Sequence, residues 1–271
     1  MTQDVWLASH PYLRPVADFH TQVATAAASI PCGSTHIPHW DDYLGDYQAG
    51  IPLLRSSHAS IDFEPAEAML VALVGSLTSQ PLPEKLAREC RASDAQLRHE
   101  MNAPRRAVAW LLDNEVFKPA HPGLLRYLGW TALARFLCPL GDAFRRWREE
   151  ERWLRGYCPT CGSAPAMAQL VGIDPGRLRL LSCGCCNTRW RYRRIGCPFC
   201  ESAVDHRLSA LAIEGEKYFR IDYCQSCRAY LKTYNGEGSE PLFLADWTSL
   251  HLDIIARDRG LKRLANSLYE L

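Results

Sequence analysis

Four Cys-x-x-Cys pairs, spread over residues 158–227, constrain this chain more than any other feature of its sequence. In chain order the pairs are Cys158/Cys161, Cys183/Cys186, Cys197/Cys200 and Cys224/Cys227. Two residues between thiolates let one tight turn direct both sulfurs at one ion, and two such turns complete a tetrahedral site. A single pair would also fit a thiol-redox motif, whereas four pairs in succession favour metal binding.

The segments between the pairs predict which turns share an ion. Twenty-one residues separate the first pair from the second, and 23 separate the third from the fourth. Each segment holds two strand-like runs around a turn, Asp174-Pro175-Gly176 in one and Glu214-Gly215 in the other. Because a hairpin returns the second turn to the first, we expect sequential pairing, with crossed or nested pairing as the alternative. The expected metal sites are Cys158, Cys161, Cys183 and Cys186, and then Cys197, Cys200, Cys224 and Cys227.

The ligand set leaves the metal open. Sulfur-only tetrahedral coordination suits both zinc and iron. A zinc ion would be structural, whereas an iron ion in the same cage would be rubredoxin-like and redox-active. Cys185 is left over from the pairs, and we interpret it as a bystander thiol beside the first site in preference to a redox or exchange role.

The other cysteines and the first residues of the sequence indicate the cellular compartment in which the protein is expected. Only three of the twelve cysteines, Cys32, Cys90 and Cys138, precede residue 158, and Cys138 is expected in the core because it lies in the apolar run FLCPL. The start of the chain carries Asp4 and no cationic leader, so it does not resemble a secretory signal. We therefore expect a cytoplasmic protein with reduced thiols. Its most apolar helical stretches are short or carry arginine, which argues against a membrane span.

The first part of the chain has helical periodicity. Apolar residues from Ala66 to Leu77 follow the i, i+3, i+4 pattern of one buried face, and further helices are predicted from about Pro104 and Pro122. We expect Pro139 and Gly141 to interrupt the last helix and a charged helix to follow, with Asp142 capping its first turn.

These patterns predict an α+β fold, with an N-terminal helical domain, two rubredoxin-like or zinc-ribbon β modules and a C-terminal helix. The expected boundaries are 1–156, 157–195, 196–245 and 246–271.

The charge balance and the motifs of the sequence argue against several classes of function. The chain has 31 basic and 30 acidic residues, so its net charge attracts neither nucleic acid nor membrane. Locally, TRWRYRR places three arginines (189, 191 and 193) on one face of a strand and two aromatic residues on the other. We interpret this face as solvated or as a docking surface for a protein, because aromatics on the opposite face would not stack on bases. No phosphate loop, nucleophile elbow or HExxH motif indicates an enzyme.

Five segments resemble the formate dehydrogenase accessory protein family, FdhE. They are CPTCGSAP (158–165), LLSCGCCNTRW (180–190), IGCPFCES (195–202), DYCQSCRAYLK (222–232) and ADWTSLHLDIIARDRG (245–260). The resemblance covers about 153–260. It implies a cytoplasmic, non-catalytic assembly factor that contacts the catalytic subunit of respiratory formate dehydrogenase, with rubredoxin-like iron at the cysteine motifs. Glu201 and Arg228 occupy positions where many rubredoxin-like turns have glycine, which implies poorer turn geometry at the second site.

We therefore expect an assembly factor with two iron sites, zinc being the alternative metal, and with the formate dehydrogenase catalytic subunit as its partner. The first alternative is a rubredoxin-like electron carrier or thiol-redox protein. The second alternative is a zinc-ribbon protein that binds nucleic acid.

Overall fold

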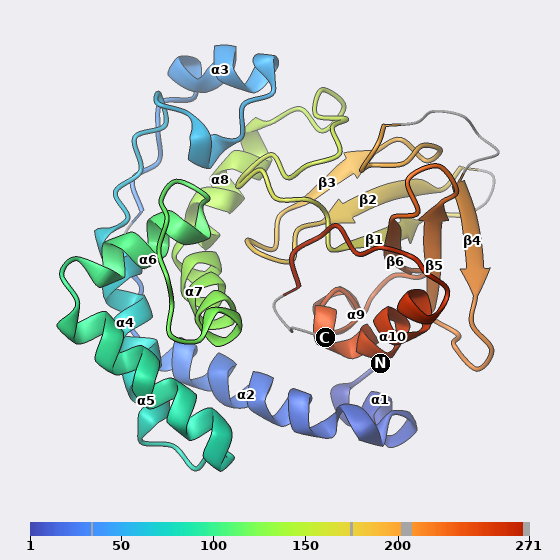
Figure 1. Ribbon diagram of the computed structural model, residues 1–271. Coiled ribbons are helices and arrows are strands. Elements are labelled where there is room, and N and C mark those ends of the chain that lie inside the picture. The colour runs from blue at the N-terminus through green and yellow to red at the C-terminus, as the bar shows by residue number, and fades with distance from the viewer. Residues whose placement is uncertain (34, 174–175, 202–207, 268–271) are drawn as a thin grey trace. The chain divides into compact units, whose positions relative to one another are not determined.

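A computed structural model of the chain describes residues 1–33, 35–173, 176–201 and 208–267 (Figure 1). By contacts the chain divides into two compact units. A helical unit comprises Asp18–Gly45 and Leu54–Trp147, and a sheet unit comprises Met1–Ala17, Asp46–Leu53 and Arg148–Leu271. Residues 1–17 thus group with the cysteine-rich half. The predicted division into 1–156, 157–195, 196–245 and 246–271 stays a prediction.

The helical unit is built around α4 (Glu64–Thr78), which packs against α5 (Glu84–His99), α6 (Ala103–Leu111) and α7 (Pro122–Phe136). The buried residues of α4 recur at the spacing predicted from the sequence: Ala66, Met69, Leu70, Leu73, Val74 and Leu77. This spacing gives the helix an apolar stripe that its neighbours cover. The unit also contains α8 (Cys138–Trp147), most of η2 (Leu53–Arg55) and of α2 (Arg14–Ser29), and part of α3 (Trp40–Ala49).

The prediction for the segment after α7 was partly wrong. Helix α8 begins at Cys138, so Pro139 lies in its first turn, where a proline costs little because its missing N–H would have no helical partner there. Asp142 is inside the helix and does not cap it. The helix ends at Trp147, and the chain then buries Trp153, whose Nε1 donates to Tyr157 O at 2.9 Å. Cys138 is exposed in the first turn of α8, so its expected place in the core was also wrong.

The two ribbons share one six-stranded sheet. The strands are β1 (Met167–Val171), β2 (Leu178–Ser182), β3 (Arg189–Tyr192), β4 (Leu208–Ala212), β5 (Phe219–Cys224) and β6 (Tyr230–Tyr234), in the order β3-β2-β1-β6-β5-β4. Each ribbon is a three-stranded antiparallel meander. Strands β1 and β6 pair in parallel, with Met167 opposite Lys232, and this pairing joins the ribbons.

The two predicted hairpins form, as β1–β2 and β4–β5. The predicted turn residues Asp174 and Pro175 lie outside the described residues, whereas Gly215 turns the β4–β5 hairpin with a φ of 83°. Strand β3 alternates as predicted. Trp190 and Tyr192 are buried, and the arginines of the strand are half-buried on the other face.

Short helices from both ends of the chain cover the core of the sheet unit (Figure 1). They are α1 (Gln3–Ser9), η1 (Pro11–Leu13), α9 (Glu240–Phe243), η4 (Asp246–Ser249) and α10 (Leu250–Asp258). Trp6 of α1 packs edge-on against Phe219 and Phe243, and its Nε1 donates to Thr248 O at 3.2 Å. The C-terminal helix expected within 246–271 is α10, which is shorter because the chain turns at Gly260 with a φ of 66°. Over the described ranges, no helix combines the length and apolarity needed to cross a bilayer.

Candidate metal centres

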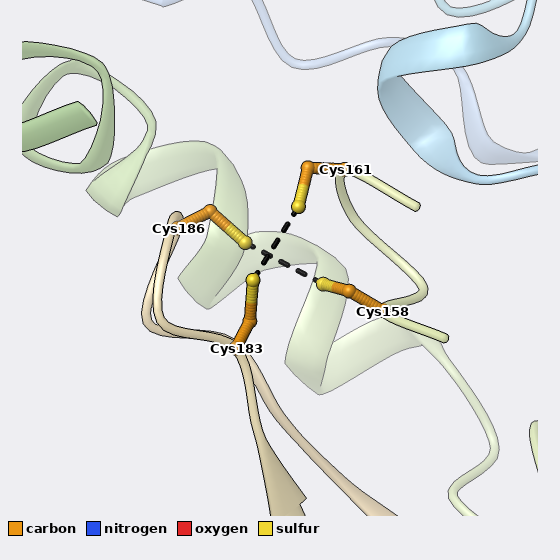
Figure 2. A group of neighbouring side chains, drawn as sticks. All are labelled: Cys158, Cys161, Cys183 and Cys186. Atoms are coloured by element: carbon orange, nitrogen blue, oxygen red, sulfur yellow. Dashed lines mark hydrogen bonds between the residues drawn. The ribbon is translucent and has the colours of Figure 1, made fainter. Parts of the chain in front are cut away.

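The first four-cysteine group converges on one point from two turns (Figure 2). Cys158 Sγ lies 3.5 Å from Cys186 Sγ, and Cys161 Sγ lies 3.5 Å from Cys183 Sγ. A tetrahedral ion with metal–sulfur bonds of about 2.3 Å places its sulfurs roughly 3.8 Å apart. The four thiols therefore surround a space suited to one such ion after a small expansion.

The second group has the same form. Cys197 Sγ lies 3.7 Å from Cys227 Sγ, and Cys200 Sγ lies 3.8 Å from Cys224 Sγ. In each group all four sulfurs lie within 4.8 Å of one another. The structure thus brings the eight predicted residues together in the sequential pairing, and each set fits a four-thiolate ion.

The two groups occupy equivalent places in the two ribbons. One cysteine turn precedes the first strand of each meander, and the other turn links its second and third strands. The linking turns close in the same way, since Cys183 N donates to Thr188 O and Cys224 N donates to Ala229 O, both at 2.9 Å. The sheet register therefore fixes the distance between the two turns of each group.

Each cysteine turn ends in a residue with left-handed backbone. The residues that follow the second cysteine of each pair are Gly162 (φ 82°), Asn187 (φ 59°), Glu201 (φ 54°) and Arg228 (φ 62°). Glu201 and Arg228 adopt the conformation that glycine favours, at a cost of about 1–2 kcal/mol each. The sulfurs of the second group are nevertheless spaced as a tetrahedral ion requires, so the poorer geometry implied by these two residues does not appear in the thiol positions.

Backbone N–H groups approach sulfurs in both groups. Cys185 N lies 3.4 Å from Cys183 Sγ, and Phe199 N lies 3.4 Å from Cys197 Sγ. Such contacts disperse thiolate charge and orient the ligand. The side chain of Cys185 is buried outside the four-thiol group.

In the metal-free protein the thiols hold their protons unequally. Burial raises the pKa of Cys158, and hydrogen bonds with the neighbouring thiols raise the pKa of Cys183. For Cys186, burial opposes ionisation but hydrogen bonds from the other three thiols outweigh it and lower the pKa. Four thiolates side by side repel one another, so the metal-free group keeps protons that a divalent ion has to displace in order to bind.

The second group also contains a thiol with a raised pKa and a thiol with a lowered pKa. Burial raises the pKa of Cys197 to about 12. The Cys224 thiol is also buried, but backbone N–H groups of Cys227 and Ser226 outweigh the burial and lower its pKa to about 7. The second group is also less covered than the first, because Cys200 is exposed and Cys227 is half-exposed.

The arginines of β3 contact other residues of the sheet unit. The Arg189 guanidinium donates to Gln169 Oε1, and Arg191 donates to Glu151 Oε1. Arg193, just beyond the strand, is exposed and lies over the Tyr192 ring, 5.6 Å from its centroid. The basic patch is thus partly neutralised within the chain.

A further group of metal-binding residue types was not predicted. His10, Glu216 and His251 place one ligand atom each within 4.8 Å of the others. These residues are separated by 206 and 35 positions, and no local motif connects them. Only the tertiary fold brings them together.

Comparisons with known proteins point to one family. The family model "FdhE, central domain" matches residues 157–194. A "Protein FdhE homolog" from Aquifex aeolicus is 26% identical over 252 residues, which are 92% of this chain and 83% of that protein. A "Protein FdhE homolog" from Pseudomonas aeruginosa is 32% identical over 213 residues, 74% of this chain and 67% of that protein. The crystal structure of the FdhE protein from Pseudomonas aeruginosa has a similar fold, with a TM-score of 0.60 and 22% identity, over 91% of this chain and 85% of that one.

Proposed function

The chain belongs to the FdhE family, and from this premise we propose that it is a cytoplasmic, non-enzymatic assembly factor for respiratory formate dehydrogenase. The family is that of the formate dehydrogenase accessory proteins. The observation that carries the proposal is the pair of four-thiol groups mounted on one continuous sheet in a member of this family. Turns held by metal and by strand register present a fixed surface, which suits a protein that recognises an unfinished enzyme and performs no reaction on it.

We propose iron as the metal in both thiol groups, with zinc as the alternative. The donor set and sulfur spacing fit one ion in each group, held by Cys158, Cys161, Cys183 and Cys186 and by Cys197, Cys200, Cys224 and Cys227. Bound iron would supply one-electron redox chemistry, whereas zinc would supply only cross-linking. Anaerobic purification with metal analysis and an ultraviolet-visible spectrum distinguishes the two metals. Replacement of Cys224 and Cys227 should remove one equivalent.

We propose that the client is the catalytic subunit of formate dehydrogenase and that it docks on the sheet unit. A respiratory enzyme of this kind has to receive its metal cofactors before it crosses the membrane, so a cytoplasmic protein that holds the unfinished subunit has a physical task. Arg193, just beyond β3, is the best candidate contact, because Arg189 and Arg191 already donate to Gln169 and Glu151.

Two measurements on one set of strains test this function. The first is formate dehydrogenase activity in a strain that lacks this protein, and the second is recovery of the catalytic subunit with the tagged chain. We expect loss of activity in the deletion strain, and loss of subunit recovery with Cys158→Ser and with Arg193→Glu. Cys185→Ser is the matched control for a cysteine beside the first group but outside it, and Cys138→Ser is the control for an exposed cysteine. Normal activity in the deletion strain, with no subunit recovered, would contradict the proposal.

One observation favours the rival function of a rubredoxin-like electron carrier. The second thiol group has an exposed cysteine, Cys200, so a redox partner has access to the edge of this centre. An electron carrier needs an iron ion that changes reversibly between Fe³⁺ and Fe²⁺ and stays bound in both oxidation states. A zinc-loaded chain that restores activity to the deletion strain would exclude this role and leave the assembly factor.

A further inference from the structure

Three side chains from distant parts of the sequence meet at one carboxylate oxygen in the sheet unit. His10 lies between α1 and η1, Glu216 lies in the β4–β5 turn, and His251 lies in α10. Glu216 Oε1 is 2.9 Å from His10 Nε2 and 2.7 Å from His251 Nε2. The side chains of His10, Glu216 and His251 are 12%, 7% and 13% exposed. The cluster is therefore largely covered, but small ions can reach it from solvent.

The hydrogen bonds around this cluster do not suit a neutral imidazole at His10. His10 Nδ1 lies 3.1 Å from Trp6 O, and because a carbonyl only accepts, the proton of a neutral ring must be on Nδ1. The lone pair of Nε2 then faces a carboxylate oxygen, which repels it. Glu216 Oε2 and His251 Nδ1 are buried and have no hydrogen-bond partner in the described part of the chain. A cation between the rings and the carboxylate would remove the repulsion and also use the second carboxylate oxygen.

We propose that His10 Nε2, His251 Nε2 and the Glu216 carboxylate bind one divalent transition-metal ion of the Zn²⁺ or Fe²⁺ class. Two imidazoles and one carboxylate on one side of an ion form a facial set that leaves coordination positions open. Ligands about 2.1 Å from an ion lie roughly 3.0 Å apart when they subtend a right angle. The observed separations of 2.7 and 2.9 Å agree with this arrangement after a small expansion.

The surroundings of the cluster support a metal site. The Nδ1–H of His10 donates to a backbone carbonyl, which is the usual second contact of a metal-bound histidine and fixes its ring orientation. The indole of Trp6 stacks on the same ring with 3.7 Å between centroids. The Tyr12 ring lies edge-on to both histidines, at 5.8 and 5.9 Å between centroids. Both imidazoles are thus held in place before an ion binds.

An ion at this site would connect the first residues of the chain to the β4–β5 turn and to α10. It would be independent of the thiol groups, because its donors are nitrogen and oxygen and none of its ligands is a cysteine. The competing interpretation is a hydrogen-bonded network in which a protonated histidine pairs with Glu216. Metal stoichiometry and ligand-sensitive spectra distinguish the two.

The experiment uses the full-length chain, stripped of metal and then titrated with Co²⁺ and, separately, with Zn²⁺. We expect the chain to bind three equivalents of metal ion. Two of them should protect the eight thiols from thiol reagents and, with Co²⁺, give cobalt–thiolate charge-transfer absorption. The third should have neither effect. Glu216→Gln keeps the shape and a hydrogen-bonding amide, and it should weaken the third equivalent by about 100-fold or more. Glu214→Gln, which changes an exposed carboxylate in the same turn, should keep all three.

The result that overturns the proposal is a wild-type chain that takes up only two equivalents when all eight thiols are protected. A third equivalent that persists in Glu216→Gln with unchanged affinity would overturn it equally. If Glu216→Gln loses its cooperative unfolding transition, the wild-type stoichiometry and the cobalt spectrum of the third equivalent decide the question without the variant. Neither readout depends on the proposed role in enzyme assembly.

Discussion

Lys232 of β6 lies opposite Met167 of β1 in the parallel pairing that joins the two ribbons, and its ammonium group is buried between two carboxylates. Lys232 Nζ is 2.6 Å from Asp246 Oδ1 and 2.8 Å from Asp253 Oδ2. Arg263 contacts the same two carboxylates at 2.8 and 2.7 Å. One buried and one half-buried cation thus balance two buried anions at the strand that joins the ribbons.

Lys232→Met should strongly destabilise the sheet unit. It leaves Asp246 and Asp253 with one cation between them, and loss of one partner from a buried ion pair costs about 3–5 kcal/mol. Chemical unfolding followed by far-ultraviolet dichroism measures the change in the free energy of unfolding. Lys262→Met replaces an exposed lysine of the same unit and should change that free energy by less than about 0.5 kcal/mol. Equal effects of the two substitutions would show that the buried charges contribute little.

The same network predicts loss of stability in acid. Burial opposes ionisation of Asp246, but the charges of Lys232 and Arg263 outweigh it and hold its pKa below the ordinary value. A folded-state pKa below the unfolded value of about 3.9 gives stabilisation that is complete above that value and is lost as the pH falls further. The free energy of unfolding should therefore decline steeply below about pH 4, and less steeply in Asp246→Asn. Identical slopes for the two chains in the same metal state would contradict this assignment.

A chelator should remove metal from the second thiol group before the first. Three of the four first-group cysteines are buried, whereas Cys200 of the second group is exposed. A chelator therefore reaches the second ion more easily and displaces its outer ligand first. Cys197→Ser leaves only the first group complete, and Cys158→Ser leaves only the second. Release rates should be slower in Cys197→Ser than in Cys158→Ser, and the reverse order would refute the argument from exposure.

Two substitutions at Glu201, whose backbone is left-handed, test the energetic cost of that conformation. Its φ of 54° is unfavourable for most side chains but is tolerated by asparagine, which already occupies the equivalent position at residue 187. Glu201→Asn should raise the stability of the second metal centre by about 0.5–1 kcal/mol, and Glu201→Val should lower it by about 1 kcal/mol or more. Thermal unfolding of the metal-loaded chain measures both changes. No difference between asparagine and valine would mean that the turn relaxes to another conformation.

Much of the sheet unit could be predicted because short, continuous segments of the sequence determine its turns, hairpins and strand faces. The Cys-x-x-Cys spacing determines the turns, the hairpins determine which turns meet, and the alternation in TRWRYRR determines which side of β3 is buried. The helix α4 was predictable for the same reason, since one buried face repeats along a continuous segment.

The features that were missed depend on contacts between distant segments. Both faces of β1 and β6 are buried, so hydrophobic alternation does not reveal that these two strands are neighbours. The start of α8 was missed because Pro139 reads as a helix breaker unless it is known to lie in a first turn. His10, Glu216 and His251 were missed because metal-site motifs are recognised by short spacing, and these residues have none.

The hydrogen bond from Trp6 Nε1 to Thr248 O spans 242 positions of the chain. This separation determines the order in which parts of the sheet unit can pack during translation. The first ribbon is complete once β3 has emerged, so its thiols can meet early in translation. Trp6 and Leu7, although made before both ribbons, have no complete core to enter until η4 and α10 follow. At about 5–20 residues per second, the stretch from residue 192 to residue 258 takes roughly 3 to 13 seconds to translate. Helix α1 therefore packs into the sheet unit only after η4 and α10 have been made, and during that interval its apolar face is open to chaperones and proteases.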